Sequence, residues 1–158
     1  MSVLSAQSIR RRNIFEPFSE RTRCENSGLT YGLSAAGYDV RIKQGFQLQP
    51  GDFVLASTVE HFNIPTDCIA IVHDKSTLAR LGLAVQNTVA EPGWRGYLTL
   101  ELTNHNVYPI TLFPGQPIAQ ILFHKLDVPT DQPYAGRYQD QEDYPVPAKS
   151  LSGKEEII

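Results

Sequence analysis

The chain has 158 residues, a formal net charge of −3 and a pI near 5.8. This length suits one domain with its own core, and the mildly acidic balance argues against a general affinity for nucleic-acid polymers or acidic membranes. No apolar run approaches the roughly 20 residues that span a bilayer, and the N-terminus lacks a hydrophobic signal segment, so we expect a cytoplasmic protein without a membrane partner. Cys24 and Cys68 are too few for a disulfide framework or a zinc site of their own.

The sequence up to residue 42 predicts one short helix and one strand. Residues 5–12 are typical of a helix that Ser5 can cap. The arginine run at 10–12 is interpreted as a solvated face or a subunit contact, because the net charge disfavours polynucleotide binding. Residues 13–29 are polar and irregular, and residues 38–42 then alternate as a strand.

From residue 46 onward, short apolar runs alternate with glycine and proline turns. The runs expected to form strands are 46–48, 53–56, 68–72, 110–113 and 118–123. Many short strands separated by turn residues indicate an all-β sandwich or barrel. Only residues 76–81 have helical character, so the prediction is an all-β fold with a few short helices.

A cluster of two cations and two hydroxyls lies near the start of residues 73–104, the stretch around which the rest of the chain is organised. Its members are Lys75, Ser76, Thr77 and Arg80. These side chains are of the kind that bind oligophosphates, and Arg80 lies one helical turn beyond Ser76. Ordinary helix capping is the alternative explanation of the same residues.

A turn and a strand close this part of the chain. Residues 91–96 are turn-forming and contain the single tryptophan, Trp94, with the carboxylate of Glu91. One interpretation is that these residues form an ordinary turn with Trp94 in the core. The other is that Glu91 and Trp94 contact a ligand. Over residues 97–103, strict alternation predicts a strand with three leucines on one face and Thr99 and Glu101 on the other.

The composition changes after Lys125 toward Pro, Asp, Gln and Tyr, with little apolar periodicity. Residues 127–158 are therefore expected to be a tail that becomes ordered against something else. A surface tail whose tyrosine and arginine side chains bind nothing is the alternative.

Three ordered motifs carry a resemblance to a known family. They are Lys-Ser-Thr-x-Ala-Arg-x-Gly from Lys75, Glu-Pro-x-Trp-x-Gly from Glu91 and Thr-Leu-Glu-Leu-Thr-Asn from Thr99. Together they resemble the dCTP deaminase family of the dUTPase-like superfamily. Flanking matches at 31–41 and 136–141 extend the likeness over most of the chain, from residue 4 to residue 150.

The resemblance implies a distorted jelly-roll or β-clip barrel, with residues 1–158 forming a single domain. It also implies a homotrimer with active sites at the subunit interfaces, and a tail, residues 127–158, that closes over the nucleotide phosphates. In that tail, the residues that would bind the substrate are Tyr134, Arg137, Tyr138 and Gln141.

Roles for the earlier residues follow from the same resemblance. The cluster of Lys75, Ser76, Thr77 and Arg80 would bind the substrate. Glu91 would contact the sugar 3′-hydroxyl, and Trp94 would pack on the deoxyribose. The base would be read by main-chain groups of Asn87, Thr88, Val89 and Ala90.

The implied reaction is hydrolytic deamination of dCTP to dUTP, an attack on the C–N bond of a cyclic amidine. Glu101 would act as the base that activates water, while Ser76 and Arg80 hold that water and the charge developing on the ring. The chain has neither the H-x-E nor the P-C-x-x-C motif of zinc-dependent deaminases, so zinc catalysis is not expected. Mg²⁺ would enter only with the triphosphate.

The chain departs from the family pattern in its tail. Glu142 and Asp143 follow Gln141 where glycine is usual, which places two acids beside the expected triphosphate. A bifunctional enzyme that forms dUMP, or a dUTPase, is an alternative, with Glu91 at the position of the dUTPase carboxylate. Residues 150–154 are a poor substitute for the glycine-rich phosphate loop of dUTPases. A non-catalytic nucleotide-binding module is a further alternative.

Overall fold

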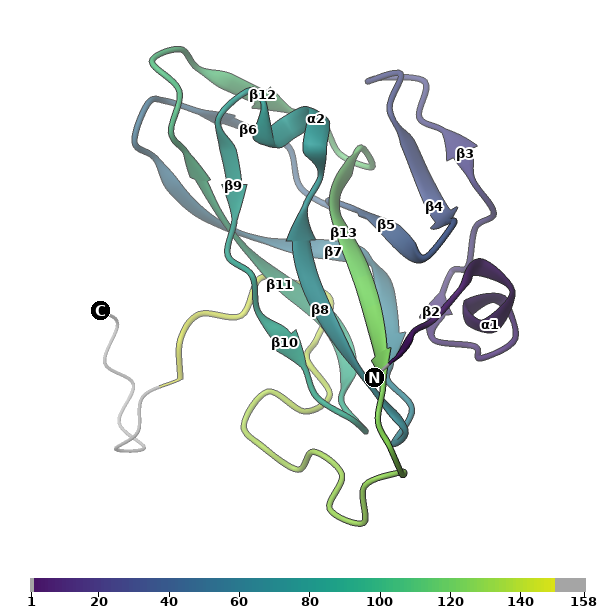
Figure 1. The fold of residues 1–158 in the computed structure, drawn as a ribbon. Helices are drawn as coiled ribbons and strands as arrows, with labels where there is room; N and C mark the ends of the chain where they lie inside the picture. The colour runs from purple at the N-terminus through teal and green to yellow at the C-terminus, as the bar shows by residue number, and fades with distance from the viewer. Residues whose placement is uncertain (1, 150–158) are drawn as a thin grey trace.

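The structure is a computed structural model that describes residues 2–149, and it consists mainly of strands (Figure 1). A seven-stranded sheet has the order β10-β8-β13-β5-β4-β3, with β1 also paired to β13. Its strands are β1 (Ser2–Val3), β3 (Thr22–Arg23), β4 (Thr30–Ser34), β5 (Gly37–Arg41), β8 (Cys68–Asp74), β10 (Val89–Ala90) and β13 (Pro117–Lys125).

A second, four-stranded sheet lies behind the first in Figure 1 and has the order β2-β7-β11-β9. Its strands are β2 (Phe15–Glu16), β7 (Phe53–Asn63), β9 (Leu83–Val85) and β11 (Arg95–Asn104). A small antiparallel pair, β6 (Phe46–Leu48) and β12 (Ile110–Leu112), lies near one end. Every pairing between strands is antiparallel in the described residues, as expected for short strands joined by turns.

Two short helices complete the fold, α1 (Ala6–Arg10) and α2 (Ser76–Ala79). Both are shorter than the helices predicted at 5–12 and 76–81. Ser5 occupies the N-cap position of α1, but its side chain caps no backbone group there and its hydroxyl instead donates to the hydroxyl of Ser8. Neither helix within residues 2–149 is long and apolar enough to cross a membrane.

The core lies between the two large sheets and follows from their period-two patterns. On β11, Leu98, Leu100 and Leu102 all point into it and are buried, as the alternation predicts. The predicted all-β fold is confirmed, and Thr99 and Glu101 lie on the opposite face of the strand. That face carries the candidate site.

One buried ion pair joins the two sheets. The Arg41 guanidinium of β5 donates to the Glu60 carboxylate of β7 at 2.8 Å, and the Arg41 backbone N–H donates to the other oxygen. The Glu60 side chain is fully buried, so burial raises the pKa of its carboxyl, which the hydrogen bonds from Arg41 oppose.

Replacing Arg41 by methionine should destabilise the protein by about 3–5 kcal/mol, because the Glu60 carboxylate would remain buried without its partner. Urea-induced unfolding followed by circular dichroism measures the change. The control is Arg10→Ala, which removes an exposed ion pair to Glu20 and should leave the unfolding midpoint close to that of the wild type. Equal midpoints for all three proteins would contradict the prediction.

Candidate functional site

A cavity of about 480 Å³ lies on the outer face of β11, between β10 and the C-terminal part of the chain. Nine residues singled out in the sequence line it together: Thr88, Val89, Ala90, Glu91, Trp94, Glu101, Tyr134, Tyr138 and Gln141. They come from two strands, one turn and the tail, segments up to 53 residues apart in the chain. This volume is within the range of pockets that enclose a small organic ligand.

Glu101 is the acidic group at the inner wall of this cavity. Its Oε2 is buried and has no hydrogen-bond partner among residues 2–149. Its neighbour across the strand pair is Leu55 of β7, and Phe53 lies two residues farther along the same face. These apolar walls remove water from the carboxylate, and this burial raises the pKa of Glu101, opposed in part by a backbone hydrogen bond. A raised pKa makes this carboxylate a stronger base than an exposed one.

Residues 134–149, here called the strap, contribute six residues to the lining of the cavity. This yellow part of the chain runs beside β10 and β11 in Figure 1. At its start, the Tyr134 N–H donates to the Pro92 carbonyl at 2.8 Å, and the Trp94 indole N–H donates to the Tyr138 carbonyl at 2.7 Å. Farther along, the Tyr97 N–H donates to the Gln141 carbonyl at 3.1 Å, in a parallel bridge centred on Gly96. The strap thus pairs with the part of β11 that the short strand β9 leaves uncovered.

Two glycines make room for the chain that passes over the cavity. A Cβ on Gly96, which has φ of 139°, would lie 2.5 Å from the Gln141 nitrogen. A Cβ on Gly93, which has φ of 84°, would lie 2.7 Å from the Pro133 side chain. Both positions therefore need glycine, for the close approach as well as for the backbone angle.

Two of the acidic residues of the strap form ion pairs with cations of their own chain. Asp140 pairs with Arg95, and Asp143 pairs with Lys43. Glu142 is exposed, and none of the three acids is among the residues that line the cavity. The electrostatic conflict expected from the sequence at positions 142 and 143 therefore does not arise inside the cavity.

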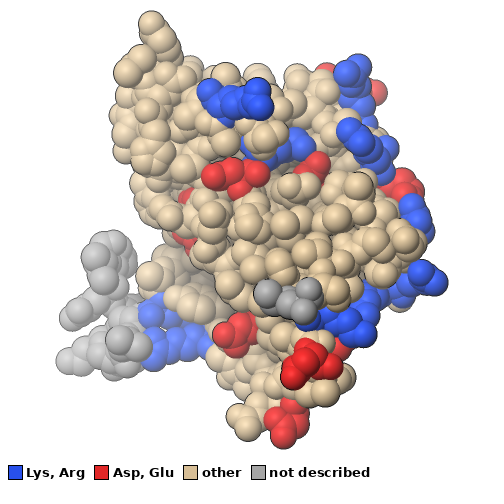
Figure 2. All heavy atoms as spheres, viewed as in Figure 1, with Lys and Arg blue, Asp and Glu red and all other residues tan. Residues whose placement is uncertain are grey.

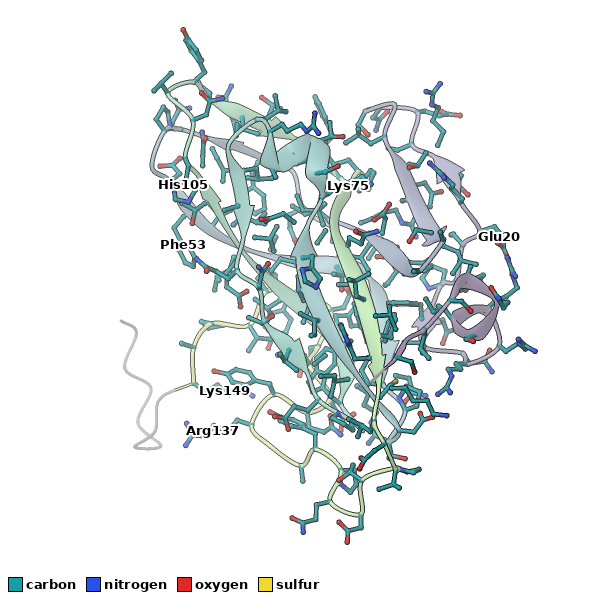
Figure 3. The ribbon with its side chains drawn as sticks, viewed as in Figure 1. Glu20, Phe53, Lys75, His105, Arg137 and Lys149 are labelled. Atoms are coloured by element: carbon teal, nitrogen blue, oxygen red, sulfur yellow. The ribbon has the colours of Figure 1, made fainter. Side chains whose placement is uncertain are left out.

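The α2 cluster of Lys75, Ser76, Thr77 and Arg80 lies elsewhere. It follows the end of β8, and none of its members lines the cavity within one chain. Figure 3 shows Lys75 near the top of the molecule, far from Arg137 and Lys149 of the strap. Lys75 is already engaged, since its ammonium group donates to Asp39 at 2.8 Å.

Two further predicted residues lie outside the cavity. The side-chain amide of Asn87, oriented to donate, reaches the carbonyls of Val72 and Val85 at 3.1 and 3.3 Å. Arg137 donates to the Lys149 carbonyl at 3.2 Å. Trp94 does line the cavity, but it is also a core residue, only 4% exposed and packed edge-to-face on Phe62.

Some residues of the cavity were not singled out from the sequence. They are Phe53, Leu55, Leu98, Thr99, Val146, Pro147 and Ala148. The register between β7 and β11 would have indicated Phe53 and Leu55, because cross-strand neighbours share a face. Thr99 was predicted only to share the strand face of Glu101, and it is buried because the strap covers it.

Potential metal ligands are dispersed in this structure. No group of three or more His, Cys, Asp or Glu side chains within residues 2–149 is placed to hold a metal ion. Cys24 and Cys68 are both buried and unbridged. The tail residues 150–158, including the segment 150–154 compared above with a phosphate loop, lie outside the described residues.

The fold and the cavity define the class of protein. The chain resembles the dUTPase of EIAV, with a TM-score of 0.57 and 19% identity over 78% of this chain and 97% of that one. It also resembles the dUTPase from phage phi11 of S. aureus, with a TM-score of 0.57 and 14% identity over 75% of this chain and 90% of that one. At these identities the likeness concerns the fold: this is an all-β protein of the dUTPase-like type.

Sequence comparison identifies the family within that class. The dCTP deaminase-like family model matches residues 13–126. The chain is 33% identical to a dCTP deaminase of Acidobacterium capsulatum, with 93% of this chain and 99% of the relative covered. It is 36% identical to a dCTP deaminase of Campylobacter fetus subsp. fetus, with 93% and 98% covered. The chain belongs to the dCTP deaminase-like family, and the resemblance found in its motifs is confirmed.

Proposed function

We propose that this protein is a dCTP deaminase that converts dCTP and water into dUTP and ammonia. The observation that carries the proposal is the buried carboxylate oxygen of Glu101, which has no hydrogen-bond partner among residues 2–149 and lies in a cavity of about 480 Å³. A buried polar atom without a partner is costly, so its retention suits a group that meets a partner only during the reaction. The dCTP deaminases related over nearly the whole chain support the same substrate.

Glu101 carries the proton in the mechanism. Its carboxylate takes a proton from water, the hydroxide forms a bond to C4 of cytosine, and the π electron pair of the C4=N3 double bond moves to N3. The amine then takes the proton from Glu101 and leaves as ammonia with the electron pair of the exocyclic C4–N bond, while the pair on N3 re-forms the C4=N3 double bond. The remaining C4 hydroxyl gives its proton to N3, which yields the uracil ring. Burial raises the pKa of Glu101 from its ordinary value toward neutrality, the direction that favours a group acting as base and then as acid.

The base and sugar would be bound by β10 and the turn that follows it. β10 is the edge strand of the larger sheet, so main-chain groups of Val89 and Ala90 that do not pair with β8 are available to a pyrimidine, whereas the Thr88 carbonyl already accepts a hydrogen bond from the Val72 N–H at 3.0 Å. Glu91 is exposed at the cavity and would accept a hydrogen bond from the sugar 3′-hydroxyl. The part of the Trp94 ring that lines the cavity would limit the space available to the sugar of the substrate.

The α2 cluster would reach the site from a neighbouring subunit of a homotrimer. Because Ser76 and Arg80 do not line the cavity of their own chain, their proposed role on the water and the ring requires a second chain. Figure 2 shows a mainly uncharged centre on the face formed by β8 and β13, with many of the basic side chains toward its edges. The half-buried Ile69, Ile71 and Leu122 lie on these strands, which suits a subunit contact.

The phosphates would lie under the strap. Tyr138 and Gln141 line the cavity, and Arg137 and Lys149 supply positive charge at its rim. Residues 127–158 would thereby close over the triphosphate, as the resemblance implies. Mg²⁺ would arrive with the phosphates and would neutralise part of their charge, so that no metal-ligating cluster of the chain would be needed. Such an enzyme would act in the cytoplasm, where its substrate is available.

Zinc should be unnecessary for this reaction. We expect 1,10-phenanthroline, a chelator that prefers zinc and other transition metals over Mg²⁺, to leave deamination in Mg²⁺ buffer unchanged. Ammonia release measured with and without the chelator tests this, and a known zinc-dependent cytidine deaminase assayed in parallel provides the positive control. Loss of activity that added Zn²⁺ restores would contradict the metal-free role of Glu101.

Product analysis tests the proposed function directly. The purified protein is incubated with dCTP and Mg²⁺, and the products are separated by ion-exchange chromatography. dUTP and ammonia in equal amounts are the expected result. Release of dUMP and pyrophosphate would identify a bifunctional enzyme, and hydrolysis of added dUTP alone would identify a dUTPase. Tight dCTP binding without turnover would instead indicate a non-catalytic nucleotide-binding module.

A further inference from the structure

Thr99 of β11 holds the strap by its side chain at the cavity, while Arg95 at the start of the same strand pairs with Asp140 at the exposed surface. The Thr99 hydroxyl donates to the side-chain oxygen of Gln141 at 3.0 Å and accepts a hydrogen bond from the Val146 N–H at 3.0 Å. Thr99 is 7% exposed. One side chain therefore binds two points of the strap that are five residues apart.

Thr99 also lies on the same strand face as Glu101, two residues before it. Val146, which makes the second Thr99 contact, is also the first of three apolar strap residues that line the cavity containing Glu101. The other two are Pro147 and Ala148. These residues form the outer wall of the cavity, while Phe53 and Leu55 of β7 belong to its inner wall. The Thr99 hydroxyl is thus placed to fix the position of the outer wall.

We propose that Thr99 is a positioning residue that latches the strap across the cavity and so keeps bulk water away from Glu101. The proposal rests on the proposed function insofar as Glu101 is the catalytic base. The latch itself is a property of the strap and of β11, and it can be measured without any substrate.

Few other ionisable groups face Glu101. From the turn after β10 comes Glu91, which is exposed, and from the strap come the phenols of Tyr134 and Tyr138. β7 contributes only the apolar side chains of Phe53 and Leu55 to the cavity, and β9 contributes none of its side chains. Entry of water is therefore the main change that an open strap would bring to the carboxylate.

The test compares Thr99→Val, which keeps the shape of the side chain and removes the hydroxyl, with Thr99→Ser, which keeps the hydroxyl. Thr103→Val is the matched control, since Thr103 lies on the same face of β11 and is not among the residues that line the cavity. In case the first variant does not fold, Val146→Pro removes the N–H donor from the strap and leaves β11 unchanged.

Two readouts report on the latch alone. Trp94 is the single tryptophan, and its indole N–H donates to the strap at Tyr138, so an open strap should shift its fluorescence emission to longer wavelength. Hydrogen exchange of residues 141–148 should become about tenfold faster or more in Thr99→Val, given the loss of two hydrogen bonds. Thr99→Ser and Thr103→Val should behave like the wild type.

A third readout concerns Glu101. The acid limb of the kcat/KM profile should move to lower pH in Thr99→Val, because a hydrated carboxylate has a lower pKa, and kcat/KM at neutral pH should fall about tenfold. Unchanged emission and exchange in both Thr99→Val and Val146→Pro would overturn the latch. Faster exchange with an unmoved acid limb would overturn its effect on Glu101. Absence of deamination in the wild type would refute the proposed function, while fluorescence and exchange would still decide the latch.

Discussion

Replacing Glu101 by glutamine is expected to reduce the rate of dCTP deamination by about 10²- to 10⁴-fold, the usual contribution of a positioned general acid and base. Glutamine fills the same space on β11, beside Leu55, but it can neither take the proton of water nor return one to the amine. Ammonia release at saturating dCTP measures the loss. A dissociation constant for dCTP close to that of the wild type would show that the effect falls on chemistry rather than on binding.

The stability of the same variant gives an independent control. A carboxyl group whose pKa is higher in the folded state than in the unfolded chain disfavours folding once the pH rises above its unfolded value, and the penalty is complete above the folded value. Glu101→Gln should therefore unfold at a temperature no lower than the wild type at pH 8. Glu142→Gln, at an exposed strap residue outside the cavity, should keep full activity. Full activity of Glu101→Gln would remove this residue from the mechanism.

The scaffold of the site was predictable because it depends on local periodicity. Alternation along β11 placed its leucines in the core and Glu101 on the opposite face, since side chains of a strand point to alternate sides. The turn signals likewise indicated short antiparallel strands, and the structure has them. The helices were predicted too long at both places, because the pattern of so few residues does not define where a helix ends.

The covering of the site could not be predicted in the same way. The strap has no apolar periodicity, and its place is set by main-chain pairing with the free edge of β11 and by the space above Gly96. Consequently the burial of Thr99 was missed, although its position on the strand face was right. The ion pairs of Asp140 and Asp143 also depend on this path, so their effect on the phosphates could not be judged from sequence spacing.

Residues that the proposed homotrimer would contribute from another subunit are a further limit, and they lead to the second large effect. Arg80→Ala is expected to lower deamination by about 10²- to 10³-fold, as is usual when a positioned donor to developing charge is lost. Arg80 lines no cavity of its own chain, whereas Glu101 does. If the proposed trimer is correct, the two residues of one active site belong to different chains.

This arrangement predicts that two inactive variants restore each other. When Glu101→Gln and Arg80→Ala are mixed in equal amounts, unfolded and refolded together, about a quarter of the sites should combine an intact Glu101 with an intact Arg80 from the neighbour. The mixture should then recover about a quarter of the wild-type activity. Variants that are refolded separately and mixed afterwards provide the control, and they should stay inactive while the trimers do not exchange subunits. No recovery in a mixture shown by mass to contain mixed trimers would place both residues in one chain's site. A fully active wild-type monomer would exclude the shared site altogether.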